Sequence, residues 1–404
     1  YIFRKLYKTE EAENAGPYAR LKFAMDYWCA LWFWPIEKAD LLPSRETFIF
    51  DMSLILEGGI FAVKKSGYTY YKTKTGENLY GINLLDYDSE TDEVVSQTAK
   101  EIKATFADLG TVNLDQLCEQ YERLALVREI AKNNHFMHWE LEFAELFEER
   151  GGFDLMIGNP PWIKITWNEE GVLSDCNPIF SVRKLTANQT TFERNNVLIS
   201  EKNKKMYFEE YTFMSGEQSF INSVCNYPLL EKQQVNLYKC FLPLAWYLSS
   251  PSGIASYVHP EGVYDDPNGG VLRKVLYKKL KYHFQFQNET KLFEIGNRNK
   301  FSLNVYCNKE TDSFDSIANI FYADTIDYCY QSDGSGPVPG IKDKNDNWSR
   351  NGHKDRILRI SENELTIFAK IFDSSDKWEN ARLPALHCTS LMKILWHSKS
   401  KKYL

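Results

Sequence analysis

The chain lacks what marks several common classes of protein. Only 21 glycines and 14 prolines occur among 404 residues, which excludes collagen and bulk disorder. The longest apolar stretch, residues 27–36 (YWCALWFWPI), ends beside Pro35. A bilayer needs about 20 apolar residues, so we interpret this stretch as a buried helix. The chain also does not open with a basic segment, an apolar run and a small-residue cleavage site, so no secretory signal is visible.

The cysteines lack the spacing of a metal or redox motif. Eight are scattered along the chain with no CxxC pair, at positions 29, 118, 176, 225, 240, 307, 329 and 388. In a chain of this length the pattern predicts buried, reduced thiols in a cytosolic protein rather than a disulfide framework. Aromatic residues, by contrast, are abundant at 15%. They favour thick cores or a surface that stacks flat ligands.

The length of the chain predicts two or three domains of about 150 residues each. The first residue is Tyr rather than Met, and the last segment (LMKILWHSKSKKYL) stops inside an apolar-basic pattern. We therefore expect the chain to be a piece of a longer polypeptide. No segment repeats at a fixed period.

Residues 1–150 have a mainly helical pattern. Apolar residues at helical spacing run through 18–34, 91–107 and 113–133, and a Thr- and Tyr-rich run at 67–80 resembles a hairpin. His135 and His138 form an HxxH pair beside Glu140, which is one way to hold a metal ion. No third ligand follows at a suitable spacing, so we favour a helix end that packs on its neighbour, and expect no metal.

The pattern changes to alternating strands and helices at residue 151. Residues 153–158 (FDLMIG) are a short apolar run bounded by glycines, which is typical of a buried parallel strand. After a polar insertion at about 165–230, we expect helices at 236–248 and 271–280, and strands at 253–259, 283–287 and 301–307. This order predicts an α/β fold with a doubly wound, Rossmann-like sheet over 151–310. For residues 311–404 the sequence pattern predicts a mixed α+β region.

The tetrapeptide Asn159-Pro160-Pro161-Trp162 follows the first strand directly. Two prolines fix φ near −65° and donate no backbone hydrogen bonds, so the strand ends in a stiff loop. At the carboxyl end of a parallel strand, such a loop lies where α/β sheets place their ligands. It presents an Asn side-chain oxygen, the Pro160 carbonyl and an indole ring.

This combination suits a planar substrate that carries an amine. The lone pair of an amine conjugated to a ring is delocalised, which makes the nitrogen a poor nucleophile. Two oxygens that accept both N–H groups favour pyramidal nitrogen and stabilise the positive charge that develops when it attacks a carbon. The indole holds the ring by stacking, at roughly 1–3 kcal/mol per base. The donor is then an activated methyl group, and the site works by positioning.

The chain resembles the adenine-specific (N6) class I DNA methyltransferases. The segments that carry the resemblance are HWELEF, FDLMIGNPPWIK, NLYKCFLPLAW, GIASYVHPEGVYDD and FSLNVY, over about residues 135–310. The family includes fused restriction–modification enzymes and phage-defence methylases of the PglX-like kind. The resemblance implies methyl transfer from S-adenosylmethionine to an adenine flipped out of double-stranded DNA, with residues beyond 310 opening a target-recognition region. It also implies that other subunits of such a system are partners.

The resemblance assigns roles residue by residue. Asn159 and Pro160 accept hydrogen bonds from the adenine N6 amine, Pro161 stiffens the loop, and Trp162 stacks on the flipped base. Lys164 is a candidate phosphate contact, or else a solvated lysine. Phe301 lies where the family places a second aromatic ring, although a core role is the favoured reading. His259-Pro260-Glu261 is expected to border the same cleft in a positioning role.

One part expected from the family is absent from the sequence pattern. S-adenosylmethionine is bound partly by a glycine-rich turn between a strand and a helix. The glycine clusters at 58–59, 151–152, 269–270 and 334–336 do not have this context. We therefore expect that the chain holds the catalytic half of the fold without the cofactor loop, and that it is inactive alone.

Charge supports DNA binding only locally, since the formal net charge is −7. Residues 268–309 hold nine basic residues against two acidic ones. Such a run is usually a solvated helix face, and a track along a phosphate backbone is the alternative. The insertion adds further cations that are expected to close over the substrate. The first set is Arg273, Lys274, Lys278, Lys279, Lys281, Lys291, Arg298, Lys300 and Lys309. The second is Arg183, Lys184, Arg194, Lys202, Lys204 and Lys205. Two alternatives stay open: a methyltransferase of another planar amine (a protein glutamine or an RNA base), and a non-catalytic DNA-binding module.

Overall fold

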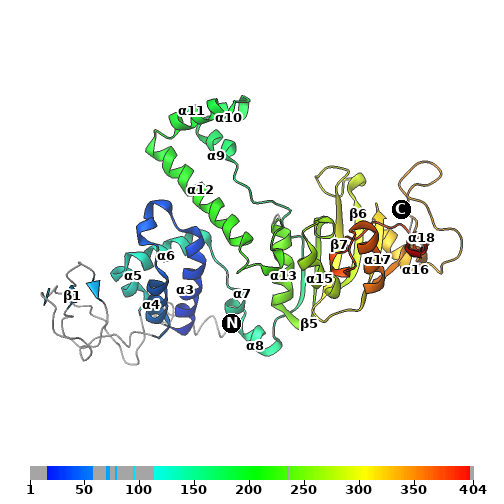
Figure 1. Cartoon of the computed structure of the whole chain (residues 1–404), viewed down its shortest axis with the longest axis horizontal. Helices are drawn as coiled ribbons and strands as arrows, with labels where there is room; N and C mark the ends of the chain where they lie inside the picture. Colours follow the sequence, from blue (N-terminus) through cyan, green and yellow to red (C-terminus); the bar gives the residue numbers. More distant parts are fainter. Residues whose placement is uncertain are drawn as a thin grey trace. The chain divides into compact units, whose positions relative to one another are not determined.

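The chain folds into two compact units, Tyr1–His138 and Trp139–Leu404. The structure, a computed structural model, describes residues 16–57, 70–72, 78–79, 94–95, 113–233 and 236–400 (Figure 1). We describe each unit by itself. Within the described residues, no helix has the length and apolar character needed to cross a bilayer.

The first unit is mainly helical, as expected. Its elements are α3 (Pro17–Ala30), η1 (Leu31–Phe33), η2 (Ile36–Leu41), α4 (Arg45–Glu57), α5 (Leu114–Gln120), α6 (Glu122–Asn134) and a small sheet of β1 (Tyr70–Lys72), β2 (Asn78–Leu79) and β3 (Val94–Val95). The antiparallel pair of β1 and β2 confirms the predicted hairpin. The helix predicted at 91–107 is wrong at Val94–Val95, which pairs with β1 as a strand; the rest of that range lies outside the described residues.

The core of the first unit explains its helical stripes. Phe23 and Tyr27 of α3 pack with Leu124 and Val127 of α6 in one buried cluster. The buried Asp51 carboxylate accepts hydrogen bonds from the Tyr27 hydroxyl (2.7 Å) and from Arg123 Nε (2.7 Å), which satisfies the charge inside that core.

The HxxH pair is part of this unit's packing. His138 Nε2 lies 2.7 Å from Asp26 Oδ1, and both side chains are buried. His135 ends α6 in the left-handed region, with φ of 51°. The two histidines therefore act as a helix terminus and a buried polar contact, and no group of three or more metal-ligating side chains occurs among the residues that the structure describes.

The second unit carries the main sheet and the helices that cover it. Its strands are β4 (Phe153–Gly158), β5 (Ser249–Pro260), β6 (Leu280–Gln287), β7 (Lys300–Cys307), β8 (Ser313–Ile320) and β9 (Leu358–Ser361). Its α-helices are α7 (Trp139–Glu142), α8 (Ala144–Arg150), α9 (Glu169–Cys176), α10 (Ile179–Val182), α11 (Ala187–Val197), α12 (Glu201–Asn222), α13 (Leu237–Leu248), α14 (Gly262–Asp265), α15 (Gly270–Lys279), α16 (Asp324–Gln331), α17 (Glu362–Phe372) and α18 (Thr389–Ser400). Single 3-10 turns complete it: η3 (Pro228–Leu230), η4 (Asn288–Thr290), η5 (Lys354–Arg356) and η6 (Trp378–Asn380).

The sheet is open and mixed, in the order β4-β5-β7-β6-β8-β9. β4 runs parallel to β5 and β6 parallel to β8, whereas β7 is antiparallel to both β5 and β6. The mixed α/β class is confirmed. The strands and helices predicted between 153 and 307 all form, with ends shifted by a few residues.

Two strands that the sequence pattern did not reveal extend the sheet. β8 and β9 follow β7 in the chain and pair onto the same sheet, so the boundary expected at residue 310 falls between two strands of one sheet. The compact units divide after His138 rather than at 150. The short α7 and α8 therefore go with the strand that they precede.

The core of the second unit lies mainly on one face of the sheet. Ala255 and Tyr257 of β5 pack with Leu242 of α13, Leu276 of α15 and Leu365 of α17. The opposite face is covered near β6 and β8, where α16 packs through Cys329 in a smaller cluster. Along β5 the side chains alternate between buried and half-buried, as expected for a strand with one well-covered face.

The polar insertion forms an arm of the second unit. α9, α10 and α11 lie together beyond the far end of the long helix α12, which leads back to the sheet (Figure 1). We refer to residues 165–222 as the arm.

Candidate functional site

The Asn159–Trp162 loop begins where β4 ends. Asn159 and Pro161 are exposed, Pro160 is buried, and Trp162 is half-buried. A Cβ at Gly158, the last residue of β4, would lie 3.2 Å from Cε1 of Tyr257, so a larger residue there would have to shift that ring. The loop thus occupies the carboxyl end of a parallel strand, which is the ligand-binding edge of α/β sheets.

The Trp162 ring is fixed from two sides. Its Nε1 donates to the Val258 carbonyl of β5 (3.3 Å). The ring packs at a tilt against Phe293 (5.0 Å between centroids) and against Phe301 (5.9 Å). A half-buried ring held in this way keeps a defined orientation and still has surface for a planar ligand.

Phe301 lies in the core and supports Trp162 from behind. Its side chain is only 3% exposed and stacks parallel to Phe286 at 5.4 Å. The ring is therefore not open to a substrate in this structure, which agrees with the core role favoured for it. The half-buried Phe293 packs edge-on against Phe301 at 4.8 Å and also contacts Trp162, and the sequence pattern did not single it out.

The loop that carries Phe293 is held by hydrogen bonds from a buried side chain. Asn288 is fully buried, and its Nδ2 donates to the carbonyls of Phe293 (2.9 Å) and Ile295 (3.0 Å). This loop also displays exposed cations near the aromatic rings: Lys291, Arg298 and Lys300. Lys164, just after the Asn159–Trp162 loop, is exposed as well.

Much of the remaining basic run is engaged in the fold. Arg273 is 0% exposed and donates to the carbonyls of Asp266 (2.6 Å) and Asn380 (3.1 Å), so it is a structural residue and not a phosphate contact. Lys279 donates to the Asn308 carbonyl (2.8 Å). The run at 268–309 is therefore not one continuous basic track, because Arg273 and Lys279 serve packing. Lys281, Lys309 and the cations of the loop at 288–300 are exposed.

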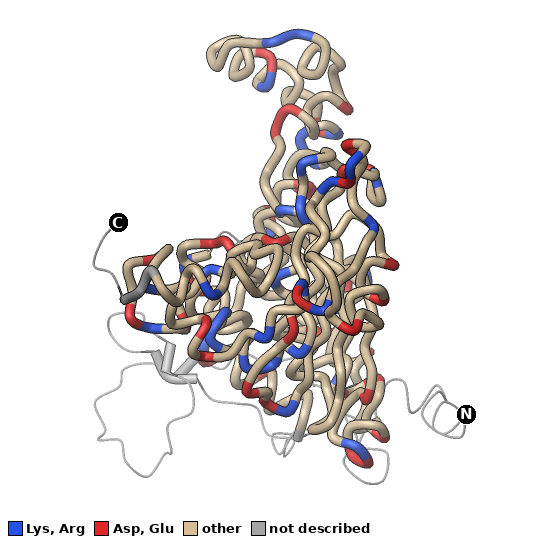
Figure 2. Tube along the Cα trace, turned by 90° about the vertical axis from the view of Figure 1, so that its right-hand side faces the viewer, with Lys and Arg blue, Asp and Glu red and all other residues tan. Residues whose placement is uncertain are grey.

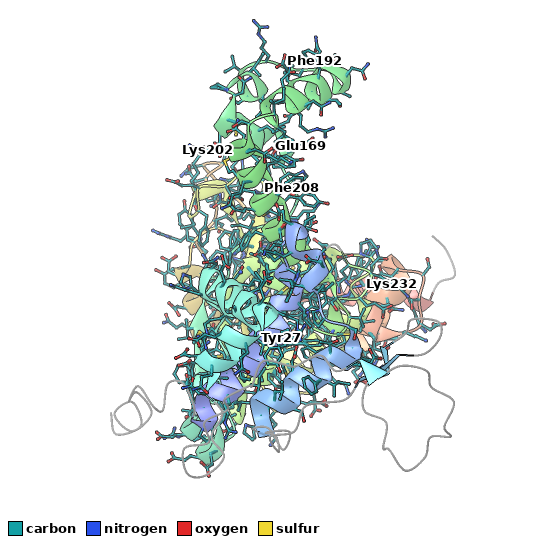
Figure 3. The ribbon with its side chains drawn as sticks, turned by 90° about the vertical axis from the view of Figure 1, so that its left-hand side faces the viewer. Tyr27, Glu169, Phe192, Lys202, Phe208 and Lys232 are labelled. Atoms are coloured by element: carbon teal, nitrogen blue, oxygen red, sulfur yellow. The ribbon has the colours of Figure 1, made fainter. Side chains whose placement is uncertain are left out.

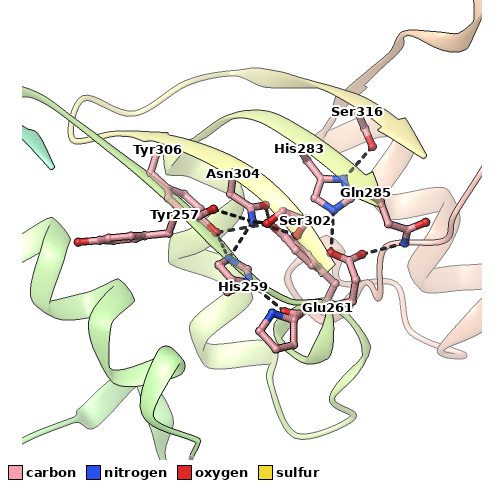
Figure 4. Close-up of polar contacts among 11 residues, drawn as sticks. Tyr257, His259, Glu261, His283, Gln285, Ser302, Asn304, Tyr306 and Ser316 are labelled. Atoms are coloured by element: carbon pink, nitrogen blue, oxygen red, sulfur yellow. Dashed lines mark hydrogen bonds and ion pairs between the residues drawn. The ribbon is translucent and has the colours of Figure 1, made fainter. Parts of the chain in front are cut away.

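A buried polar network lies at the ends of β5, β6 and β7 (Figure 4). His259 Nε2 contacts the Tyr306 hydroxyl (2.8 Å) and Asn304 Nδ2 (3.0 Å). Glu261 accepts from Gln285 Nε2 (2.8 Å) and lies 3.2 Å from His283 Nε2. The side chains of this network are buried.

Burial and hydrogen bonding shift the pKa values in this network. Burial disfavours the imidazolium and lowers the pKa of His259 to about 4, although the Pro260 carbonyl opposes the shift. Burial also raises the pKa of the Glu261 carboxyl, but His283, Ser302 and Gln285 outweigh it and lower that pKa to about 2. The neutral His259 and the charged Glu261 link β5, β6 and β7 through their hydrogen bonds, and the loop-positioning role expected for this segment stays a prediction.

The glycines do not form a cradle for S-adenosylmethionine. A Cβ at Gly152 would lie 2.4 Å from the Leu248 carbonyl oxygen, so that glycine serves close backbone packing. The pair at 269–270 faces the Arg273 and Asn380 side chains. Gly334 and Gly336 lie in a loop after α16, and the pair at 58–59 falls outside the described residues. The described residues thus do not fit the cofactor by themselves.

β4 is an unusual strand for its position. Among the described residues it pairs only with β5, which leaves its other edge free. On one face, Leu155 is 59% exposed and Ile157 is 76% exposed. Parallel strands are ordinarily buried on both faces, and apolar edges invite pairing with another strand.

Comparison with known proteins places the loop within a family match. The sequence model of one family, Eco57I restriction-modification methylase, matches residues 13–207, which include Asn159–Trp162. No curated protein matches the chain.

A solved structure described as "cryoEM structure DrdV-DNA complex" matches at 11% identity, covering 48% of this chain and 16% of that one, with a TM-score of 0.23. This chain spans only about a sixth of that chain's length. The family match shows that residues 13–207 are similar to restriction-modification methylases.

Proposed function

We propose that this chain is the catalytic part of a DNA adenine-N6 methyltransferase of a restriction–modification or phage-defence system, which methylates an adenine flipped out of the duplex. The observation that carries the proposal is the Asn159–Trp162 loop. It follows a parallel strand at the ligand-binding edge of the sheet and is backed by the fixed rings of Phe293 and Phe301.

The proposed chemistry uses the two oxygens at the start of the loop. The Asn159 side-chain oxygen and the Pro160 carbonyl accept the two N6 hydrogens of the flipped adenine, while Trp162 stacks on its ring. The grip favours the pyramidal nitrogen and stabilises its developing charge. The exposure of Asn159 and the defined orientation of Trp162 support these roles.

The DNA backbone beside the flipped base needs cations. Lys164 and the exposed Lys291, Arg298 and Lys300 flank the aromatic rings and suit this contact, since phosphate contacts supply most of the affinity of proteins for DNA. They replace the helical basic track in our proposal.

S-adenosylmethionine is the proposed methyl donor, and we propose that a part of the enzyme outside the described residues binds it. When bound, the donor supplies an electrophilic methyl group. The free, apolar edge of β4 supports this division, because a donor-binding strand paired there would end beside Asn159. On this proposal the 404-residue chain is inactive alone.

A substrate panel tests the proposal. The complete encoded protein is incubated with labelled S-adenosylmethionine and an adenine-containing duplex, an RNA of the same sequence, or a protein mixture. We expect label in the duplex, at N6 of adenine. Label confined to RNA or protein would overturn the DNA assignment. A protein that binds DNA but shows no heat of cofactor binding in calorimetry would be a non-catalytic module.

A further inference from the structure

The arm leaves and rejoins the sheet beside the Asn159–Trp162 loop. The backbone N–H of Leu237 donates to the Ile163 carbonyl (2.9 Å), and Gln218 Nε2 donates to the Ile165 carbonyl (2.9 Å). Ile221, at the end of α12, is buried in the main core. The base of the arm is therefore anchored at the candidate site.

Side-chain contacts join the helices of the arm to one another. The Glu169 carboxylate of α9 accepts from Arg194 Nη1 of α11 (3.0 Å) and from the Tyr207 hydroxyl of α12 (2.7 Å). Trp167 packs edge-on against Tyr207 (5.5 Å) and Tyr211 (5.2 Å). These contacts join three helices at one point.

This junction stays ionised in neutral solution. Burial raises the pKa of Glu169, but the bonds from Tyr207 and Arg194 outweigh it and lower that pKa. Burial and the Glu169 carboxylate raise the pKa of Tyr207 to about 12. The charged carboxylate accepts charge-assisted hydrogen bonds from the guanidinium and from the neutral phenol, and these bonds hold the helices together.

The outer part of the arm, residues 181–205, is basic and rich in exposed amides. It holds six cationic residues against two anionic ones, in a chain whose net charge is −7. Arg183, Lys184 and Lys202 are exposed and form no ion pair within the described part of the chain. Apart from Glu201, the acidic residues of α12 lie nearer its base: Glu209, Glu210 and Glu217.

Exposed amide and apolar groups accompany these cations. Asn188, Gln189, Asn195 and Asn196 are exposed on or beside the same helix, α11. Phe192 is 64% exposed, and Figure 3 shows it near the far end of the arm, with Lys202 farther along the chain at the start of α12. In Figure 2, Lys and Arg positions are visible on the outermost turns of this projection. Cations, amides and a ring are the groups that contact DNA backbone and grooves.

We propose that the outer part of the arm binds the phosphate backbone of double-stranded DNA at a second place, away from the flipped base. This inference rests on the proposed function for its DNA substrate. The 22 residues of α12 span about 33 Å at 1.5 Å per residue. One turn of B-DNA is about 34 Å, so the arm contacts DNA about one helical turn from the loop.

The test compares two triple variants of the chain. Arg183→Gln, Lys184→Gln and Lys202→Gln together remove the unpaired cations of the arm. The control, Lys132→Gln, Lys309→Gln and Lys377→Gln, removes three exposed lysines outside the arm. Binding to a duplex of about 36 base pairs, about three turns, is followed by fluorescence anisotropy at several salt concentrations.

We expect the arm variant to bind at least about tenfold more weakly near 0.1 M salt, and the slope of log K against log salt to fall by about 0.9 for each lost contact. The difference is expected to shrink on a duplex of about 12 base pairs, which is too short to reach both places. A photo-crosslinking residue in place of Phe192 should label the long duplex, and the same residue in place of the exposed Phe372 should not.

Equal affinities and slopes for the two triple variants on the long duplex would overturn the proposal, as would tighter binding to RNA of the same length. Its failure is separable from that of the proposed function. Methyl transfer that depends on Asn159 together with an insensitive arm rejects only the second contact. A sensitive arm in a protein that never methylates DNA rejects only the proposed reaction.

Discussion

At the scale of single residues, the two groups proposed to hold the amine differ in exposure: Asn159 lies on the surface, whereas Pro160 is buried. The buried proline fixes the backbone, and the exposed amide can meet a substrate. The Asn159 side chain is therefore the more informative one to change, because its removal leaves the loop's packing intact.

Replacement of Asn159 by Ala in the complete protein is expected to lower methyl transfer by about 100-fold or more, since one oxyanion-type contact is typically worth that much. DNA affinity should stay within about twofold, because the contact forms in the transition state and not with phosphate. Filter-binding and methylation assays measure the two quantities. Equal losses in both would show a structural role, and the exposed Asn345→Ala is the matched control.

The buried His259 gives a pH dependence to stability. Its pKa is about 4 in the folded protein against 6.5 ordinarily, so the unfolded state binds the proton first as pH falls. The free energy of unfolding should therefore fall between about pH 6.5 and 4, by up to roughly 3 kcal/mol at 1.36 kcal/mol per pKa unit. Urea unfolding at pH 7 and at pH 4.5 measures the loss.

His259→Gln is expected to reduce this loss, at the cost of lower stability at pH 7. His397→Gln, at an exposed histidine, is expected to leave it unchanged. An unaltered pH dependence in the first variant would assign the effect to another group. The lowered pKa of Glu261 acts in the same direction but at lower pH, between about 4.5 and 2.

At the scale of elements, local patterns predicted most of the sheet and missed what depends on distant contacts. The strands at Phe153–Gly158 and Lys300–Cys307 are marked by apolar runs and by the segments around them. β8 was missed because buried Ser316 and Asn319 interrupt its apolar pattern, and their side chains bond to His283 and Gln287. Only tertiary partners make such polar residues acceptable inside a sheet.

The candidate site was predicted in part for the same reason. The Asn159–Trp162 loop could be found because two prolines directly after a short apolar strand are a local signal. Phe293 could not be found, since it reaches Trp162 only through the loop that Asn288 builds. Arg273 was grouped with the basic run at 268–309 because sequence alone does not show that its guanidinium faces the carbonyls of Asp266 and Asn380.

The two hydrogen bonds to the Glu169 carboxylate give a prediction for the local stability of the arm. Glu169→Ala removes both bonds to α11 and α12, and hydrogen bonds to charged groups are worth about 1.5–3 kcal/mol. Amide hydrogens of α11 should exchange about tenfold faster or more, as measured by mass spectrometry. The neighbouring, exposed Glu170→Ala should not change them. Unchanged exchange in the first variant would show that the aromatic contacts hold the arm alone.

At the scale of the whole molecule, one edge of β4 has no partner strand among the described residues, and we expect this edge to affect how the chain behaves alone and in the complete protein. An apolar strand with an unpaired edge promotes self-association. Ile157→Lys should therefore reduce self-association of the 404-residue chain, measured by light scattering, and change its stability by less than about 0.5 kcal/mol because the side chain is 76% exposed.

The same substitution should lower cofactor binding and methylation in the complete protein, where we propose that a strand pairs with β4. Ile199→Lys is the matched control, since that side chain is 77% exposed on the arm. If Ile157→Lys left the complete protein fully active, the donor-binding part would have to attach elsewhere.

The hydrogen bond from the Leu237 amide to the Ile163 carbonyl brings together the two segments of chain that flank the arm. The segment between these two residues, which includes the arm, therefore begins and ends at neighbouring points of the fold. The arm can therefore become longer or shorter, or be replaced, without a change in the geometry of the Asn159–Trp162 loop. If the arm contacts DNA as we propose, its length sets how much of the duplex the protein spans.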